Sequence, residues 1–200
     1  MDFINKIESW NEIKINRIIA ILFSVFLVYL ALLPDIIRGG APTFVLEPIL
    51  ILIGYFLVLL LIKTYFLLLG YFTSKISKLK LKNGNKVGLP ALLIFSIVSG
   101  GVMLLMFLLW ITITIVGINQ IGDHNTLIES FLKLNPPIIT LSILLALITT
   151  FTTQSLSLQK LEKLNKPHSY LISFTTITIT AAIVWIYIKI MTFITMLAFF

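Results

Sequence analysis

Two lysines are the side chains in this sequence most able to do chemistry, because each lies inside a long apolar segment. Lys63 is the only charged residue between Pro48 and Ser74, and Lys189 lies near the end of the last such segment. A charge within hydrocarbon costs about 3 kcal/mol on insertion scales and marks a functional site by default. The alternative is that each side chain extends its ammonium to the nearest headgroup layer. Lys63 has no intramembrane carboxylate as a partner for proton transfer, since Glu47 lies at the opposite end of the same segment.

A second group of candidates consists of threonines concentrated in two neighbouring apolar segments. They would line a polar path across a membrane, or donate hydrogen bonds to their own helix and to the next one, which is the commoner use of threonine in such helices. The group comprises Thr149, Thr150, Thr152, Thr153 and Gln154 in one segment and Thr175, Thr176, Thr178 and Thr180 in the other.

Small residues in the third apolar segment are candidates for close helix contact. Ser96 and Gly100 are four residues apart, and Gly101 follows directly. A pair of small residues at this spacing lets two helix backbones approach closely within a membrane. We therefore expect a packing face here, whose neighbour is either another helix of this chain or a partner subunit.

Residue types that perform hydrolysis, phosphoryl transfer or metal chemistry are not grouped in this sequence. It contains no cysteine, no Gly-x-Ser-x-Gly, no phosphate-binding loop and no pair of histidines on one helix. His124 and His168 fall on opposite sides of a membrane in the topology derived below, so they cannot share a metal. We therefore expect a protein that is not an enzyme and has no catalytic residue, cofactor or metal site.

Five apolar segments carry these residues and make up most of the 200-residue chain. The composition is 58% hydrophobic and 12% charged, whereas charged residues make up about a quarter of a soluble domain. A helix needs about 20 apolar residues to cross the hydrocarbon of a bilayer. The sequence therefore predicts an all-α fold, a single integral membrane bundle of five transmembrane helices over residues 1–200. We expect these helices at about 17–34, 48–74, 90–117, 137–157 and 168–189.

Residues 2–14 precede the first apolar segment and place apolar side chains at helical spacing, with charged and polar side chains on the other face. This pattern predicts an N-terminal amphipathic interfacial helix with Trp10 at headgroup depth. A frayed terminus is the alternative.

Lysine and arginine alternate between rich and poor connections along the chain. Three precede the first segment, and the successive connections hold one, five, one and three. Because basic residues accumulate on the cytoplasmic side, this pattern predicts a multi-pass membrane protein with a cytoplasmic N-terminus and an external C-terminus. The net charge of +7 follows the same connections. We therefore expect anionic lipid headgroups on the cytoplasmic side as a partner, and no nucleic acid.

Three stretches carry a resemblance to a known family. Residues 65–70 lead into a basic turn at 75–86, Gly88-Leu89-Pro90-Ala91 opens the third segment, and an amphipathic stretch at 158–167 precedes the last one. In order and placement these stretches resemble the Yip-type membrane family. The resemblance implies five helices, a cytoplasmic N-terminus, and a membrane-organising role through protein and lipid contacts without catalytic residues.

Two hypotheses of function follow. The first is a non-enzymatic small integral membrane protein acting through helix and lipid contacts, either as a Yip-like organiser or as an accessory subunit of a larger membrane complex. Its partners would be other membrane subunits or further copies of itself. The alternative is a small permease or channel with a threonine-lined path through the fourth and fifth helices, together with Lys63. Permeases usually show an internal repeat or discontinuous helices, and five segments do not divide into equal halves.

Overall fold

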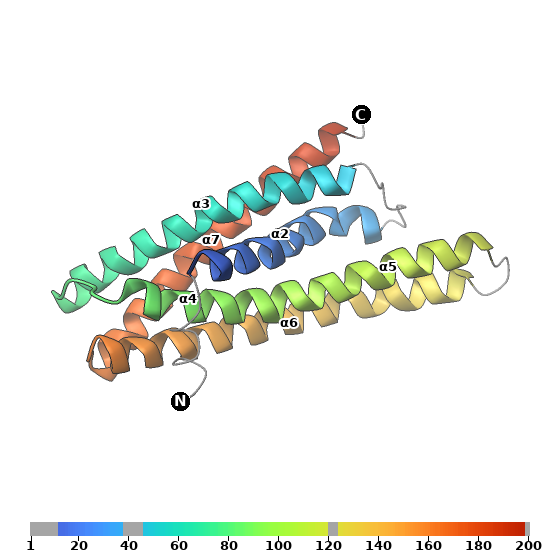
Figure 1. Cartoon of the computed structure of the whole chain (residues 1–200). Helices are drawn as coiled ribbons and strands as arrows, with labels where there is room; N and C mark the ends of the chain where they lie inside the picture. The colour runs from blue at the N-terminus through green and yellow to red at the C-terminus, as the bar shows by residue number, and fades with distance from the viewer. Residues whose placement is uncertain (1–11, 38–45, 120–123, 199–200) are drawn as a thin grey trace.

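The structure of the chain, a computed structural model, describes residues 12–37, 46–119 and 124–198. These residues are helical apart from two short turns at 78–83 and 162–165 (Figure 1). The elements are α2 (Glu12–Ile37), α3 (Leu46–Ser77), α4 (Gly84–Phe95), η1 (Ser96–Gly100), α5 (Gly101–Asn119), α6 (His124–Leu161) and α7 (Lys166–Ala198). Over the described residues, five helices are long and apolar enough to cross a membrane, with α4, η1 and α5 together forming one of them. The predicted all-α class and the five helices of that length are confirmed.

Several helix bounds differ from those expected. The third helix begins at Gly84, so Pro90 lies inside α4, and the fourth begins at His124, so Pro136 and Pro137 lie inside α6. Proline suits the first turn of a helix, which is why the prediction placed both starts at prolines. Membrane helices tolerate interior proline, because neighbouring groups satisfy the carbonyls that proline leaves free.

The predicted interfacial helix falls almost entirely on residues that the structure does not describe. Residues 2–11 of the predicted range 2–14 lie outside the described part of the chain, and residues 12–14 belong to α2.

Helix α2 is the central helix of the bundle. It packs against α3, α4, η1, α5 and α7, and Figure 1 shows it between α3 on one side and α5 and α6 on the other. Two glycines of neighbouring helices approach its backbone. A Cβ atom added to Gly54 would lie 3.3 Å from the Cβ of Ser24, and one added to Gly100 would lie 2.3 Å from the carbonyl oxygen of Leu22. Therefore η1 meets α2 where any side chain larger than hydrogen would collide with the backbone.

The third membrane-length helix changes its hydrogen-bond pattern at η1, a π-helical turn that the sequence analysis did not predict. In a π turn the backbone bonds run from residue i to i+5, and such turns are frequent at functional sites. The hydroxyls of Ser96 and Ser99 donate to the carbonyl oxygens of Leu92 and Phe95, at 2.8 and 2.6 Å. The two hydroxyls thus donate to backbone carbonyl oxygens in the region where the backbone hydrogen bonds change from the α to the π pattern. This change occurs beside the contact of Gly100 with α2.

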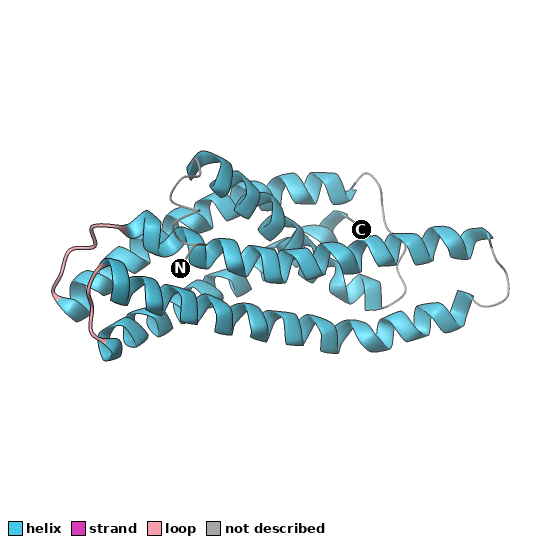
Figure 2. Cartoon of the chain, turned by 60° about the horizontal axis from the view of Figure 1, so that its bottom comes forward, coloured by secondary structure: helices cyan, strands magenta, loops and turns pink. Residues whose placement is uncertain are grey.

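The two described turns lie at the same end of the bundle (Figure 2). Glu162 joins them, because its carboxylate oxygens accept the backbone N–H of Asn83 at 2.6 Å and that of Lys82 at 3.3 Å. Asn83 is the residue that precedes the first turn of α4, and Lys82 comes one position earlier; the start of a helix has unpaired donors and favours negative charge. Glu162 therefore caps α4 and fixes the α3–α4 turn against the α6–α7 turn.

Candidate functional site

Eight exposed lysines surround the two turns, and we call this part of the molecule the basic end. Among the described residues of this end, Glu162 is the one with a carboxylate side chain. Its oxygens accept hydrogen bonds from two backbone N–H groups. One carboxylate among eight ammonium groups leaves a strongly positive surface. The lysines are Lys75, Lys78, Lys80, Lys82, Lys86, Lys160, Lys163 and Lys166.

Two buried tyrosines bind amide side chains of α6. The hydroxyl of Tyr65 on α3 donates to Oε1 of Gln154 at 2.8 Å, and the hydroxyl of Tyr29 on α2 donates to Oδ1 of Asn135 at 3.0 Å. All four side chains are buried. These bonds tie α6 to α3 and to α2 at two levels of the bundle, so they position helices.

Polar residues, all small apart from Gln154, are buried where α6 ends and α7 begins. The residues within each helix are three or four positions apart and therefore share one face of that helix. Small side chains allow helices to approach closely, and the turn at 162–165 brings these two helix ends side by side (Figure 1). The residues are Thr150, Gln154 and Ser157 on α6, and Ser169, Ser173 and Thr176 on α7.

Four of the eight threonines named as a polar path, namely Thr149, Thr153, Thr176 and Thr180, have different surroundings. Thr149 donates to the carbonyl oxygen of Leu145 at 2.8 Å, and Thr180 donates to that of Thr176 at 2.8 Å. Thr176 is itself buried with no hydrogen-bond partner for its hydroxyl, and Thr153 is half-buried. Of the four, only Thr180 lines the cavity described below.

The remaining predicted candidates divide between a helix contact and the outer surface. Ser96 and Gly100 are buried, and Gly100 contacts Leu22 of α2, so the packing face lies inside this chain. A Cβ atom added to Gly101 would meet nothing within 4 Å. Lys63 is exposed on α3 and does not line the cavity.

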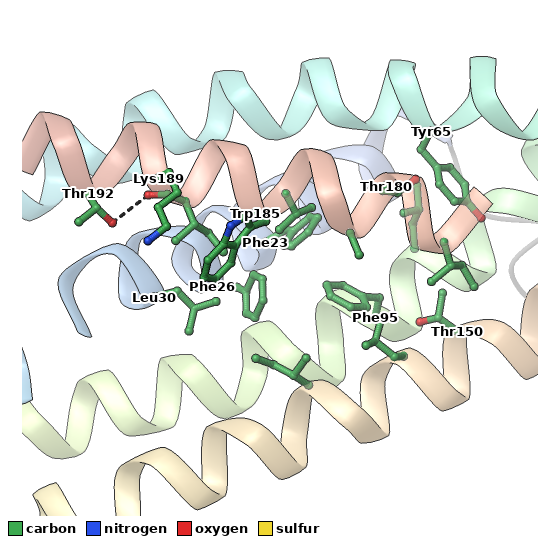
Figure 3. A pocket seen from close by; sticks show the side chains of 17 residues that line it. Phe23, Phe26, Leu30, Tyr65, Phe95, Thr150, Thr180, Trp185, Lys189 and Thr192 are labelled. Atoms are coloured by element: carbon green, nitrogen blue, oxygen red, sulfur yellow. Dashed lines mark hydrogen bonds between the residues drawn. The ribbon is translucent and has the colours of Figure 1, made fainter. Parts of the chain in front are cut away.

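A cavity of about 570 Å³ lies between α6 and α7. The two helices meet at the turn 162–165 and diverge toward the opposite end of the bundle (Figure 1). The back of the cavity is formed by aromatic rings of α2 and α4, and Figure 3 shows these rings between the two helices. The centroids of Phe23, Phe26 and Phe95 lie 5.1 to 5.7 Å from one another. Because these rings pack against each other, the wall they form exists without a ligand.

The charged residue that lines the cavity, Lys189, lies at its rim on α7. Ala181, Trp185 and Lys189 line the cavity at spacings of four residues, and all three are exposed. The cavity therefore opens to the outside along this edge of α7. The ammonium of Lys189 lies 4.8 Å from the centroid of the Trp185 ring, a cation–π distance, and Figure 3 shows the two side chains next to each other.

The lining offers large apolar surfaces for an apolar ligand to contact. It offers few free hydrogen-bonding groups to a polar ligand. Thr150 donates its hydroxyl to the carbonyl oxygen of Ala146 at 2.6 Å, Thr180 bonds its own helix, and Tyr65 binds an amide of α6. No nucleophile in this lining stands beside a general base. Among the described residues, no three His, Cys, Asp or Glu side chains gather as a metal site would require.

Sequence reasoning missed the phenylalanine wall, the cap formed by Glu162 and the Tyr29–Asn135 pair. A phenylalanine in a membrane helix faces lipid or protein equally well, so no pattern identified the wall. A usable signal did exist for the polar faces, because Ser169, Ser173 and Thr176 recur at helical spacing in an otherwise apolar helix.

The fold and the site define an all-helical bundle with five helices of membrane-spanning length, one strongly basic end and an apolar cavity on its side. Comparison with protein-family models, with characterised proteins and with solved structures gives no match.

Proposed function

We propose that the five helices cross a membrane with the basic end in the cytoplasm, and that the protein acts there without catalysis. It works through contacts of its helices and its basic end with anionic lipids and other membrane proteins. In this role the protein is either a Yip-like membrane organiser or an accessory subunit of a larger complex. The observation that carries the proposal is the basic end, where two turns far apart in sequence present eight exposed lysines together.

Electrostatics supports this proposal. A lysine near an anionic membrane surface contributes about 1 kcal/mol to attraction, and lysine-rich connections remain on the cytoplasmic side. The single carboxylate of Glu162 offsets only one of the eight lysine charges, so the surface stays strongly positive. A surface of this kind attracts anionic headgroups or an acidic segment of a neighbouring protein.

The orientation predicts which positions a membrane-impermeant thiol reagent reaches in intact cells. The chain contains no cysteine, so single-cysteine variants report directly. We expect Lys80→Cys, in the α3–α4 turn, to stay unlabelled from outside, and Asn119→Cys, at the far end of α5, to be labelled. Both should react after the membrane is permeabilised. The opposite pattern would invert the orientation, and labelling of neither site or of both would contradict a spanning bundle.

The basic end also predicts a lipid preference. After reconstitution into vesicles with equal amounts of phosphatidylglycerol and phosphatidylcholine, followed by extraction in mild detergent, we expect the protein to retain mainly phosphatidylglycerol. The double variant Lys80→Gln/Lys82→Gln should lose much of that preference, because each lysine contributes about 1 kcal/mol near an anionic surface. Native mass spectrometry would measure the retained lipids.

A matched control removes the same charge elsewhere. Lys63 and Lys133 are exposed outside the basic end, so Lys63→Gln/Lys133→Gln should keep the preference. Equal losses in the two double variants would contradict the assignment of lipid contacts to the basic end.

Transport is the second candidate function, and the cavity between α6 and α7 is the observation that favours it. The cargo would have to be largely apolar, because the hydroxyls of Thr150 and Thr180 in the lining bond helix backbones. Movement of such a compound across vesicles containing only this protein would support transport over the role proposed above.

A further inference from the structure

We propose that the cavity between α6 and α7 binds one acyl chain of an anionic phospholipid, whose headgroup lies at Lys189. This site is separate from the basic end, which lies where α7 begins. The inference rests on the membrane insertion proposed above.

The cavity matches a hydrocarbon chain in chemistry and size. Its back wall consists of the rings of Phe23, Phe26 and Phe95, and Thr150 and Thr180 direct their hydroxyls to carbonyls of their own helices. A polar solute entering this space would lose its hydrogen bonds to water without replacing them. The volume of about 570 Å³ falls within the range of ligand pockets, about 300 to 1,000 Å³.

The length of the cavity fits a chain that lies along α7. Its lining on this helix runs from Ile177 to Thr192, and the twelve positions from Ile177 to Lys189 correspond to about 18 Å at 1.5 Å per residue. One leaflet contributes about 15 Å of hydrocarbon, half of the total thickness. A single acyl chain therefore fills the cavity from Lys189 inward.

The position of Lys189 places its ammonium at headgroup depth on the side opposite the basic end. Lys166, at the start of α7, lies 23 positions earlier, or about 35 Å along the helix, against about 30 Å of hydrocarbon. Helical side chains lean toward the N-terminus of their helix, and the contact with Trp185 four positions earlier follows that direction. The ammonium is thus held at the mouth of the cavity.

The charge on Lys189 selects an anionic headgroup. Among the described side chains, no carboxylate forms an ion pair with this ammonium, and its recorded contact is the Trp185 ring. A cation in a largely apolar setting is costly without a counter-charge, and a headgroup phosphate supplies one. The bilayer is the source of the occupant because the rim of exposed residues Ala181, Trp185 and Lys189 faces outward, where a spanning helix meets lipid.

Quenching of Trp185 fluorescence by lipids brominated on the acyl chain tests this proposal. The protein would be reconstituted in phosphatidylcholine vesicles containing a small fraction of brominated phosphatidylglycerol or of brominated phosphatidylcholine. The difference between the protein and its Trp185→Phe variant isolates the signal of this residue. We expect phosphatidylglycerol to associate about fivefold more strongly, the ratio that corresponds to about 1 kcal/mol from one lysine.

Two pairs of variants separate the headgroup from the chain. Lys189→Gln should abolish the preference for phosphatidylglycerol, whereas Lys63→Gln, which removes an exposed lysine outside the cavity, should preserve it. Ala181→Phe places a ring in the cavity and should weaken quenching by phosphatidylglycerol to the level of phosphatidylcholine. Ala182→Phe, at the adjacent exposed position that does not line the cavity, should leave quenching unchanged.

The results that would overturn the site are distinct from those that would overturn membrane insertion. Equal quenching by the two brominated lipids, a preference that survives Lys189→Gln, or equal effects of Ala181→Phe and Ala182→Phe would refute the acyl-chain site while leaving the labelling pattern of Lys80→Cys and Asn119→Cys intact. Quenching by a brominated free fatty acid as strong as that by phosphatidylglycerol would assign the site to a free carboxylate amphiphile and refute the phospholipid. Failure of the labelling pattern would refute insertion itself.

Discussion

Replacement of Gly100 by leucine is expected to destabilise the protein by about 3 kcal/mol, the upper part of the usual range for overpacking. A Cβ atom at this position would lie 2.3 Å from the carbonyl oxygen of Leu22 and 2.8 Å from its carbonyl carbon. These are backbone atoms of the central helix, so they cannot move aside as the end of a side chain can. Leucine would therefore force η1 away from α2. Thermal unfolding in detergent, compared with the unmodified protein, measures the effect.

The neighbouring glycine is a matched control, because a Cβ atom at Gly101 would meet nothing within 4 Å. Alanine at Gly101 should raise stability slightly, since alanine is favoured over glycine in a helix by about 1 kcal/mol. Alanine at Gly100 should lower it, because the collision outweighs that gain. Opposite signs at adjacent positions would identify the contact as the cause. Because Leu22 belongs to the same chain, the size of any oligomer should stay the same, and a changed size with unchanged stability would place the contact between subunits.

The presence of five helices long enough to cross a membrane could be predicted from the sequence, but their full lengths and their arrangement could not. About 20 apolar residues suffice to indicate a membrane-length helix, and each of the five segments meets that condition. In a bilayer, however, lipid chains are as apolar as a protein core. In water, polar residues face out and apolar residues face in, but this bundle does not follow that rule. The polar Ser24 on α2 is buried against α3, whereas the apolar Leu67 and Leu141 face outward. The central position of α2 was therefore not visible in the sequence.

The candidate site was predictable only where a polar or small residue interrupts an apolar run. Gly100 and Gln154 stand out for that reason, and both prove to be contacts between helices. The cavity depends on the divergence of α6 from α7, with small buried residues such as Ser173 near the turn and the rings of Phe23 and Phe95 between the helices farther along. This arrangement is readable only once the two helices are known to be neighbours. Lys189 stood out in the sequence as a charge in an apolar segment, but its place beside the cavity required the fold.

Loss of the hydrogen bond between Tyr65 and Gln154 is expected to lower the stability of the bundle more than loss of any other polar contact described above. The donor and the acceptor oxygen lie 2.8 Å apart, both side chains are buried, and the amide nitrogen of Gln154 has no other partner. Tyr65→Phe would leave the whole amide without a hydrogen bond in an apolar interior. We expect a loss of about 1 to 1.7 kcal/mol, the upper range measured for such bonds in membrane helices. The same thermal unfolding experiment measures it.

A double-mutant cycle distinguishes this bond from the loss of packing. Gln154→Leu leaves the Tyr65 hydroxyl unpaired and should also destabilise, whereas Tyr65→Phe combined with Gln154→Leu removes both polar groups and should restore most of the stability. Tyr55→Phe on the same helix, where the ring is half-buried, controls for removal of a hydroxyl and should change stability little. If the losses from the two single changes simply add, the hydroxyl and the amide are not coupled, and α6 is held against α3 by the shape of the packed side chains alone.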